Sequence, residues 1–174
     1  MLMNVNIGLL IVRLVVGLVF AGHGAQKLFG WFGGHGLSGH AQLLEKMDVH
    51  PARFWAWISA LAEFLGGLGL AFGLLTPLAA TVLIGTMIIA IVRVHWSDGF
   101  WNTNRGFEFP LVLATVAFVI GLTGPGIYSL DYEFGLSLPE PLTYVVALVV
   151  MLIFVVGSLL LPPRMAQEPS HQPQ

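Results

Sequence analysis

Two charged residues lie within long apolar stretches of this sequence, where a charge is costly. Arg13 falls in the stretch from about Val5 to Gly22, and Glu63 falls in the stretch from about Phe54 to Leu75. A charge at the centre of a membrane span costs about 2.5–3.5 kcal/mol even on the scale derived from insertion experiments. Each residue lies nine positions from one end of its stretch, so antiparallel helices would hold the two at matching depth. We therefore predict a buried Arg13–Glu63 ion pair, which is either a lock on helix register or a functional group.

Further polar residues lie where apolar stretches end on one common side of the predicted bundle. The set comprises His23, Lys27, Arg93, His95, Arg105 and Glu108. Taken singly, each cation of this set is typical of an interfacial anchor that reaches the lipid head groups. The convergence of all six residues at one end of several helices instead indicates a polar site. The sequence thus predicts a candidate site here, and the anchor interpretation stays open beside it.

The histidines and the missing cysteines bear on cofactors. His23 and His95 end neighbouring stretches and are candidate metal or haem ligands, but no ligand-spaced histidine pair lies on one helix. The chain has no cysteine, so it carries no disulfide, thiolate metal site or CxxC redox pair of its own. We therefore expect no metal or haem centre. His35, His40 and His50 are expected to be solvated loop residues.

The elements that must position these residues are predicted from composition and run length. The chain of 174 residues is 56% hydrophobic and 9% charged, whereas a soluble domain carries about 25% charged residues. Five apolar stretches each approach the ~20 residues that cross a hydrocarbon core: Val5–Gly22, Phe54–Leu75, Leu78–Val94, Phe107–Gly124 and Leu142–Leu161. Backbone groups must pair within the membrane, so these stretches are predicted helices. The predicted class is an all-α polytopic transmembrane bundle whose partner is the lipid bilayer.

The connections between the stretches differ in character. Leu75-Thr76-Pro77 predicts a tight hairpin between the second and third spans. The loop at about residues 30–53 is rich in glycine, and apolar residues recur at helical spacing after Ser38, a plausible N-cap. We expect a short amphipathic helix there, lying at the membrane interface. Asp131 and Glu133 fall in a loop and are expected to be exposed, and the segment 162–174 is expected to be disordered.

The distribution of charge predicts an orientation. Five spans place the termini on opposite sides, and we call the side of the long 30–53 loop the loop side. Six cations lie at or beyond it: Lys27, Lys46, Arg53, Arg93, Arg105 and Arg164. The positive-inside rule therefore predicts a cytoplasmic loop side and C-terminus, with the N-terminus outside. The net charge of −2 gives no basic excess with which to hold nucleic acid.

Five short motifs lie in a fixed order between about residues 6 and 132. They are Arg13 with Phe20–Gly30, Ala62–Gly67, Arg93–His95, Gly106–Glu108 and Gly124–Asp131. Together these motifs resemble the DoxX family. The resemblance implies a four-helix protein of the bacterial inner membrane. It also implies an association with sulfur oxidation, as a thiosulfate:quinone oxidoreductase subunit, or with membrane complexes that handle oxidative or thiol stress.

The chain departs from that pattern at its C-terminal end. We expect a four-helix DoxX-like core over residues 1–132, an added loop and fifth span over 133–161, and the tail over 162–174. The fifth span is a candidate helix for docking a partner. Close helix approach is indicated by Gly69 and Gly73, which form a GxxxG pair. A homo-oligomer and a redox partner subunit are both left open as partners.

Three functions compete at this stage. The first is a membrane subunit of a quinone-linked redox system. In that system a quinone carbonyl or an oxyanion would be bound by three cations, Lys27, Arg93 and Arg105. Protons would be moved by His23, His95 and Glu108. The second is a transporter or channel for a small anion or protons, with the Arg13–Glu63 pair as its gate or relay. The third is a non-catalytic scaffold whose buried charges only fix packing.

Overall fold

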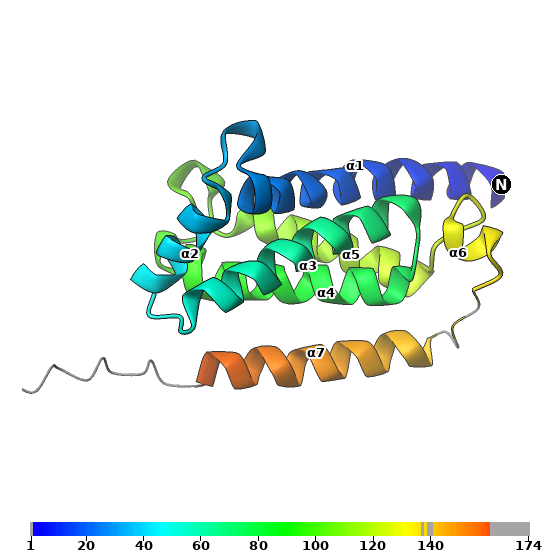
Figure 1. Ribbon diagram of the computed structural model, residues 1–174. Coiled ribbons are helices and arrows are strands. Elements are labelled where there is room, and N and C mark those ends of the chain that lie inside the picture. Colours follow the sequence, from blue (N-terminus) through cyan, green and yellow to red (C-terminus); the bar gives the residue numbers. More distant parts are fainter. Residues whose placement is uncertain (1, 137, 139–140, 161–174) are drawn as a thin grey trace, which may run out of the picture.

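The protein was analysed as a computed structural model, which describes residues 2–136, 138 and 141–160. The described residues form helices and turns without a strand, so the predicted all-α class is confirmed (Figure 1). The long helices are α1 (Leu2–Phe29), α3 (Ala52–Phe72), α4 (Thr76–Ala90), α5 (Glu108–Thr123) and α7 (Leu142–Leu160). The predicted tail and Arg164 lie outside the described residues, and which side of the membrane is cytoplasmic stays a prediction.

Short helical pieces join these long helices. On the loop side they are η1 (Trp31–Gly33), α2 (Gly36–Lys46), the π-helical η2 (Ile91–His95) that continues α4, η3 (Trp96–Asp98) and η4 (Asn102–Asn104). On the other side lies α6 (Leu130–Glu133). The predicted short helix is therefore present as α2, but it begins at Gly36 without a side-chain cap, and its place at the membrane interface stays a prediction. Ser38 lies inside it and is not its N-cap.

Four helices are long and apolar enough to cross a membrane: Met3–Phe29, Ala52–Phe72, Thr76–Asp98 and Leu142–Leu160. The predicted fourth span, α5, has only 16 residues, fewer than the ~20 that span a bilayer core. Helix α5 nevertheless lies alongside α1 from its first residues to just beyond its end. The ring of Phe109, at its start, lies 6.1 Å from the ring of His23, and beyond its end the amide of Ile127 donates to Asn6 at 3.1 Å.

Helices α1 and α3 pack backbone to backbone because small residues face each other. A Cβ added to Gly17 would lie 2.5 Å from the backbone nitrogen of Ala71, and one added to Gly24 would lie 2.4 Å from the nitrogen of Phe64. Only glycine leaves room for such an approach. These two contacts fix the antiparallel register of α1 on α3. Helix α1 also runs seven residues past its predicted end at Gly22.

Helix α7 packs on the bundle through α4 and α5. The hydroxyl of Tyr144 donates to the carbonyl of Phe118 at 3.0 Å, and a Cβ on Gly121 would meet the Tyr144 ring. Further along, Met151 lies against Gly85 of α4. Figure 1 shows α7 alongside α4, on the opposite side of the molecule from α1. The side chain of Tyr144 joins the buried core that includes Phe20, Leu83 and Ile120.

The start of α4 is capped by a residue far away in the sequence. Leu75, at the N-cap position, has a φ of 47° and supplies no side-chain cap. Asp131 takes that role, because its carboxylate accepts from the amides of Leu75 at 2.7 Å and Thr76 at 2.9 Å, and from the Thr76 hydroxyl at 2.8 Å. Asp131 is therefore buried, and the prediction that it is exposed is wrong. Glu133 is exposed, as predicted.

Candidate functional site

The predicted Arg13–Glu63 ion pair is not formed. Glu63 pairs instead with Lys27, with 2.5 Å between Lys27 Nζ and Glu63 Oε1. Arg13, which is fully buried, donates to the carbonyl oxygens of Pro125 and, at 2.5 Å, of Tyr128. The two buried charges thus belong to different ends of the molecule and have different partners.

The physical reason lies in the register of α1 against α3. The prediction ended the first span at Gly22, but the helix continues to Phe29, so a depth counted from Gly22 was misplaced. The glycine contacts align Glu63 with the last turns of α1, where Lys27 lies. Long helical side chains also point back toward the helix N-terminus. The guanidinium of Arg13 accordingly lies against Gly73, at the far end of α3.

The Lys27–Glu63 pair is buried and only partly satisfied. The Glu63 side chain is 4% exposed and that of Lys27 is 29% exposed. Glu63 Oε2 is buried and has no hydrogen-bond partner among the described residues. A buried carboxylate oxygen without a donor costs roughly 1–3 kcal/mol or more, so this atom is a position where a ligand or water donor would be stabilising.

A histidine and a serine lie beside this pair. His40 of α2 and Ser59 of α3 form a hydrogen bond of 2.8 Å between Nε2 and Oγ. Burial, and next the positive charge of Lys27, lowers the pKa of His40 from 6.5 to about 4. His40 is partly buried, so the prediction that it is a solvated loop residue is wrong. We call Lys27, Glu63, His40 and Ser59 the polar cluster.

The neutral state of His40 makes stability depend on pH. The unfolded chain takes up a proton near pH 6.5, whereas the folded chain does so only near pH 4. Stability should therefore fall as the pH drops through this window, by at most about 3 kcal/mol. Thermal unfolding in detergent at pH 7.5, 5.5 and 4.5 measures this. His40→Gln should flatten the pH dependence, and an equally steep loss in that variant would contradict the assignment.

The polar cluster faces a large cavity between α3, α4 and α7, which we call the lateral cavity. It has a volume of about 1480 Å³, and its wall includes Lys27, His40, Ser59 and Glu63. Gly66 of α3 packs against Leu83 of α4. Glu63, one turn earlier in α3, therefore lies level with the middle of the continuous segment formed by α4 and η2. The cavity therefore has polar groups on its α2–α3 wall, and mainly apolar side chains line the half that extends away from α2.

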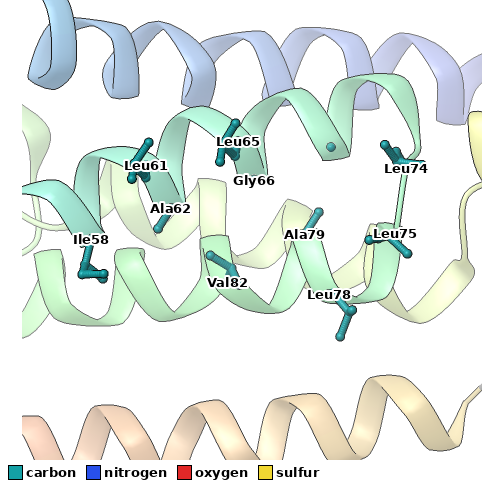
Figure 2. Close-up of a pocket in the computed structure, with 11 residues that line it drawn as sticks. Ile58, Leu61, Ala62, Leu65, Gly66, Leu74, Leu75, Leu78, Ala79 and Val82 are labelled. Carbon is teal, nitrogen blue, oxygen red and sulfur yellow. The ribbon is translucent and has the colours of Figure 1, made fainter.

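A smaller hollow extends the apolar half of this cavity. It measures about 380 Å³ and lies on the α3–α4 hairpin, as Figure 2 shows. Ile58, Ala62, Leu78 and Val82 line both spaces. Apart from backbone atoms, the smaller hollow offers only aliphatic side chains and glycines. It can therefore hold hydrocarbon but offers no head-group ligand.

The other predicted site residues divide between two places. Arg93 lines the lateral cavity and donates to the carbonyl of Ser158 at 3.2 Å. The remaining four lie elsewhere, at the end of α1 and around the loop between α4 and α5: His23, His95, Arg105 and Glu108. None of these four lines the lateral cavity.

Local contacts account for these four residues. His23 Nδ1 lies 3.2 Å from Gln26 Oε1, and His95 Nδ1 lies 2.6 Å from the carbonyl oxygen of Arg105. Glu108 accepts from the amide of Asn102 at 3.0 Å. These contacts fold the 96–107 loop and the end of α1. The proton-transfer roles of His23, His95 and Glu108 and the ligand-binding role of Arg105 stay predictions.

Sequence reasoning missed His40 and Ser59. The signal that points to His40 is the spacing of His40, Leu44 and Met47, which places them on one face of α2, and all three line the lateral cavity. Ser59 has no such signal. It lies one turn before Glu63 on α3, and only the docking of α2 brings His40 to it.

The fold and the site define a small helical membrane protein with an ion pair buried beside an apolar cavity. The chain belongs to the DoxX family, whose family model matches residues 8–96, from α1 through η2. It is 30% identical over 126 residues to "Putative oxidoreductase CatD" of Bacillus subtilis, covering 72% of this chain and 86% of that protein. It is 29% identical over 126 residues to "Inner membrane protein YqjF" of Escherichia coli, covering 72% and 91%. No solved structure matches it.

Proposed function

We propose that this chain is the membrane subunit of a quinone-linked redox system in the bacterial inner membrane, and that its polar cluster binds the quinone head group. The observation that carries the proposal is the Lys27–Glu63 pair on the wall of a large, mainly apolar cavity, in which the buried Glu63 Oε2 has no hydrogen-bond partner among the described residues. A quinone needs hydrogen-bond partners for its carbonyl oxygens and an apolar space for its chain. The lateral cavity offers both.

The chemistry of the reaction fits these groups. Reduction of a quinone to a quinol takes up two electrons and two protons, and each carbonyl oxygen becomes a hydroxyl. The Lys27 ammonium has three N–H donors, of which one is used by Glu63, so it can also donate to a quinone carbonyl. The two protons would pass from the Lys27 ammonium to the quinone oxygens, with Lys27 reprotonated from water after each transfer, and Glu63 can accept a hydrogen bond from a hydroxyl that forms. The electrons would come from a partner subunit, because this chain has no cysteine redox pair.

The charge of the site favours a neutral ligand over an oxyanion such as thiosulfate. The ammonium of Lys27 is already paired with Glu63, and Arg93 is engaged with the Ser158 carbonyl. An added anion would bring a further negative charge beside Glu63 in a buried place, where the charge of Lys27 is already neutralised. The name of the Bacillus subtilis relative, "Putative oxidoreductase CatD", agrees with a redox role. The transport hypothesis loses its premise, since Arg13 and Glu63 form no pair.

The test compares site variants with matched surface controls. Lys27→Gln and Glu63→Gln should each weaken quinone binding about tenfold or more, because each removes one hydrogen bond to a charged group. Lys46→Gln and Glu45→Gln change the same residue types at exposed positions of α2 and should behave as wild type. The measurements are the quinone retained by the purified protein and quinone reduction in membranes at equal expression. Wild-type values in both site variants would leave the scaffold interpretation.

A further inference from the structure

The lateral cavity exists only because α7 lies beside the α3–α4 hairpin. We propose that α7 makes this cavity a site for one long apolar chain attached to a neutral polar head group, taken up from within the bilayer. The inference rests on the proposed function and adds the class of ligand: a polyprenyl quinone with a long tail, and neither a short-chain quinone nor a phospholipid.

The first argument is the shape of the cavity. Its floor is α4, its walls are α3 and α7, and it extends along α4 and η2 from Leu78 to Val94. Those sixteen steps along the helix correspond to about 24 Å at 1.5 Å per residue, most of the thickness of a hydrocarbon core. Helix α7 touches α4 at Gly85 through Met151. It meets the start of α3 through Phe154, whose ring lies 6.0 Å from that of Trp55.

The second argument is the depth of the polar cluster. Glu63 lies near the middle of α4 and η2, well inside the span. A phosphate head group would have to leave the interface and bury its charge to reach that depth, which is costly because the ammonium there is already paired with Glu63. A quinone ring is uncharged and can enter an apolar site once its two oxygens have partners. The Lys27 ammonium can donate to a quinone oxygen, and the Glu63 carboxylate, whose Oε2 has no partner among the described residues, can accept from a hydroxyl of the quinol.

The third argument is the balance of charge around the cavity. Its charged lining residues are Lys27, Arg93, Asp48 and Glu63, two cations and two anions. His40 and His50 also line it. A cavity of this composition attracts no net charge, which again favours a neutral head. Since the family match ends at residue 96, the wall formed by α7 lies outside the matched region.

The experiment blocks the tail space and leaves the head-group site untouched. Ala147 lines the cavity from α7, so Ala147→Trp places a large ring within it. Ile153→Trp puts the same ring on the exposed face of the same helix, where Ile153 is 68% exposed. Binding of ubiquinone-8 and of ubiquinone-1 is measured by titration of the full chain in nanodiscs. Unfolding temperatures of both variants accompany the titrations.

We expect wild type and Ile153→Trp to bind ubiquinone-8 at least tenfold more tightly than ubiquinone-1. Ala147→Trp should lose that preference while it binds ubiquinone-1 as wild type does, which also shows that the variant is folded. If Ala147→Trp fails to fold, Ala147→Leu replaces it, with a smaller loss expected. Equal affinity of wild type for both quinones would overturn the tail site while sparing the proposed function.

Native mass spectrometry of lipids that co-purify with the chain separates the remaining cases. A co-purified long-chain quinone, lost in Ala147→Trp and kept in Ile153→Trp, supports the inference. A neutral long-chain lipid without redox activity, lost in the same variant, would support the tail site and overturn the proposed redox function. Co-purified phospholipid alone, or no binding of either quinone, would overturn the inference.

Discussion

Replacing Arg13 with methionine should lower the free energy of unfolding in detergent by about 3–5 kcal/mol. The fully buried guanidinium donates to the carbonyls of Pro125 and Tyr128, and it lies near the carboxylate of Asp131. Methionine keeps the bulk of the side chain but leaves two carbonyls without donors and removes a favourable charge from beside Asp131. Denaturant or thermal unfolding of the purified variant measures the loss.

Two further variants make this prediction specific. Arg13→Lys should recover part of the loss, because an ammonium keeps the charge but cannot reach two carbonyls with fixed geometry. The losses in Arg13→Met and Glu63→Gln should add in the double variant, because the two groups have separate partners at different depths. A coupling energy above about 1 kcal/mol between them would show that they interact after all.

Replacing Asp131 with alanine is expected to cost about 2–4 kcal/mol, the second large effect on stability. The change removes three hydrogen bonds to the start of α4 and leaves the amides of Leu75 and Thr76 without their acceptor. It also loses a negative charge at a helix N-terminus, where such a charge is stabilising. The measurement is again the free energy of unfolding in detergent.

The control for this prediction is an acidic neighbour in the same segment. Glu133 is exposed, so Glu133→Ala should change stability by less than about 0.5 kcal/mol. Asp131→Asn should fall between wild type and Asp131→Ala, because it keeps one acceptor oxygen and loses the charge. If Asp131→Ala and Glu133→Ala behaved alike, the proposed cap of α4 would be wrong.

The two ends of the bundle thus differ in kind. At the end away from α2, Arg13 ties the 124–131 loop to the middle of α1, and Asp131 ties it to the start of α4, in both cases through backbone groups. On the wall toward α2, Lys27 and Glu63 line a cavity, and one Glu63 carboxylate oxygen has no partner in the part of the chain that the structure describes. The first arrangement is what a structural lock requires, and the second is what a ligand site requires. Substitutions at the first place should therefore affect stability, and those at the second should affect ligand binding as well.

The helical membrane architecture could be predicted from the sequence because it depends on composition and run length. Four of the five predicted stretches form helices long enough to cross a bilayer, since the cost of unpaired backbone in lipid leaves no other structure. The motifs that resemble the DoxX family identified the family correctly. The high cost of burying charge also singled out Arg13 and Glu63 as important, and both are buried.

The partners of those charges were decided only by the tertiary structure. No local stop marks the end of α1 near Gly22, so its last two turns carry Lys27 to Glu63. The register that allows this follows from contacts of Gly17 and Gly24 across the helix interface, which a sequence pattern does not pair. Arg13 and Asp131 form hydrogen bonds chiefly with backbone groups. Every residue type has these groups, so the sequence does not indicate which of them a distant side chain will contact. Composition therefore determines which charges must be satisfied, whereas helix docking decides which atoms satisfy them.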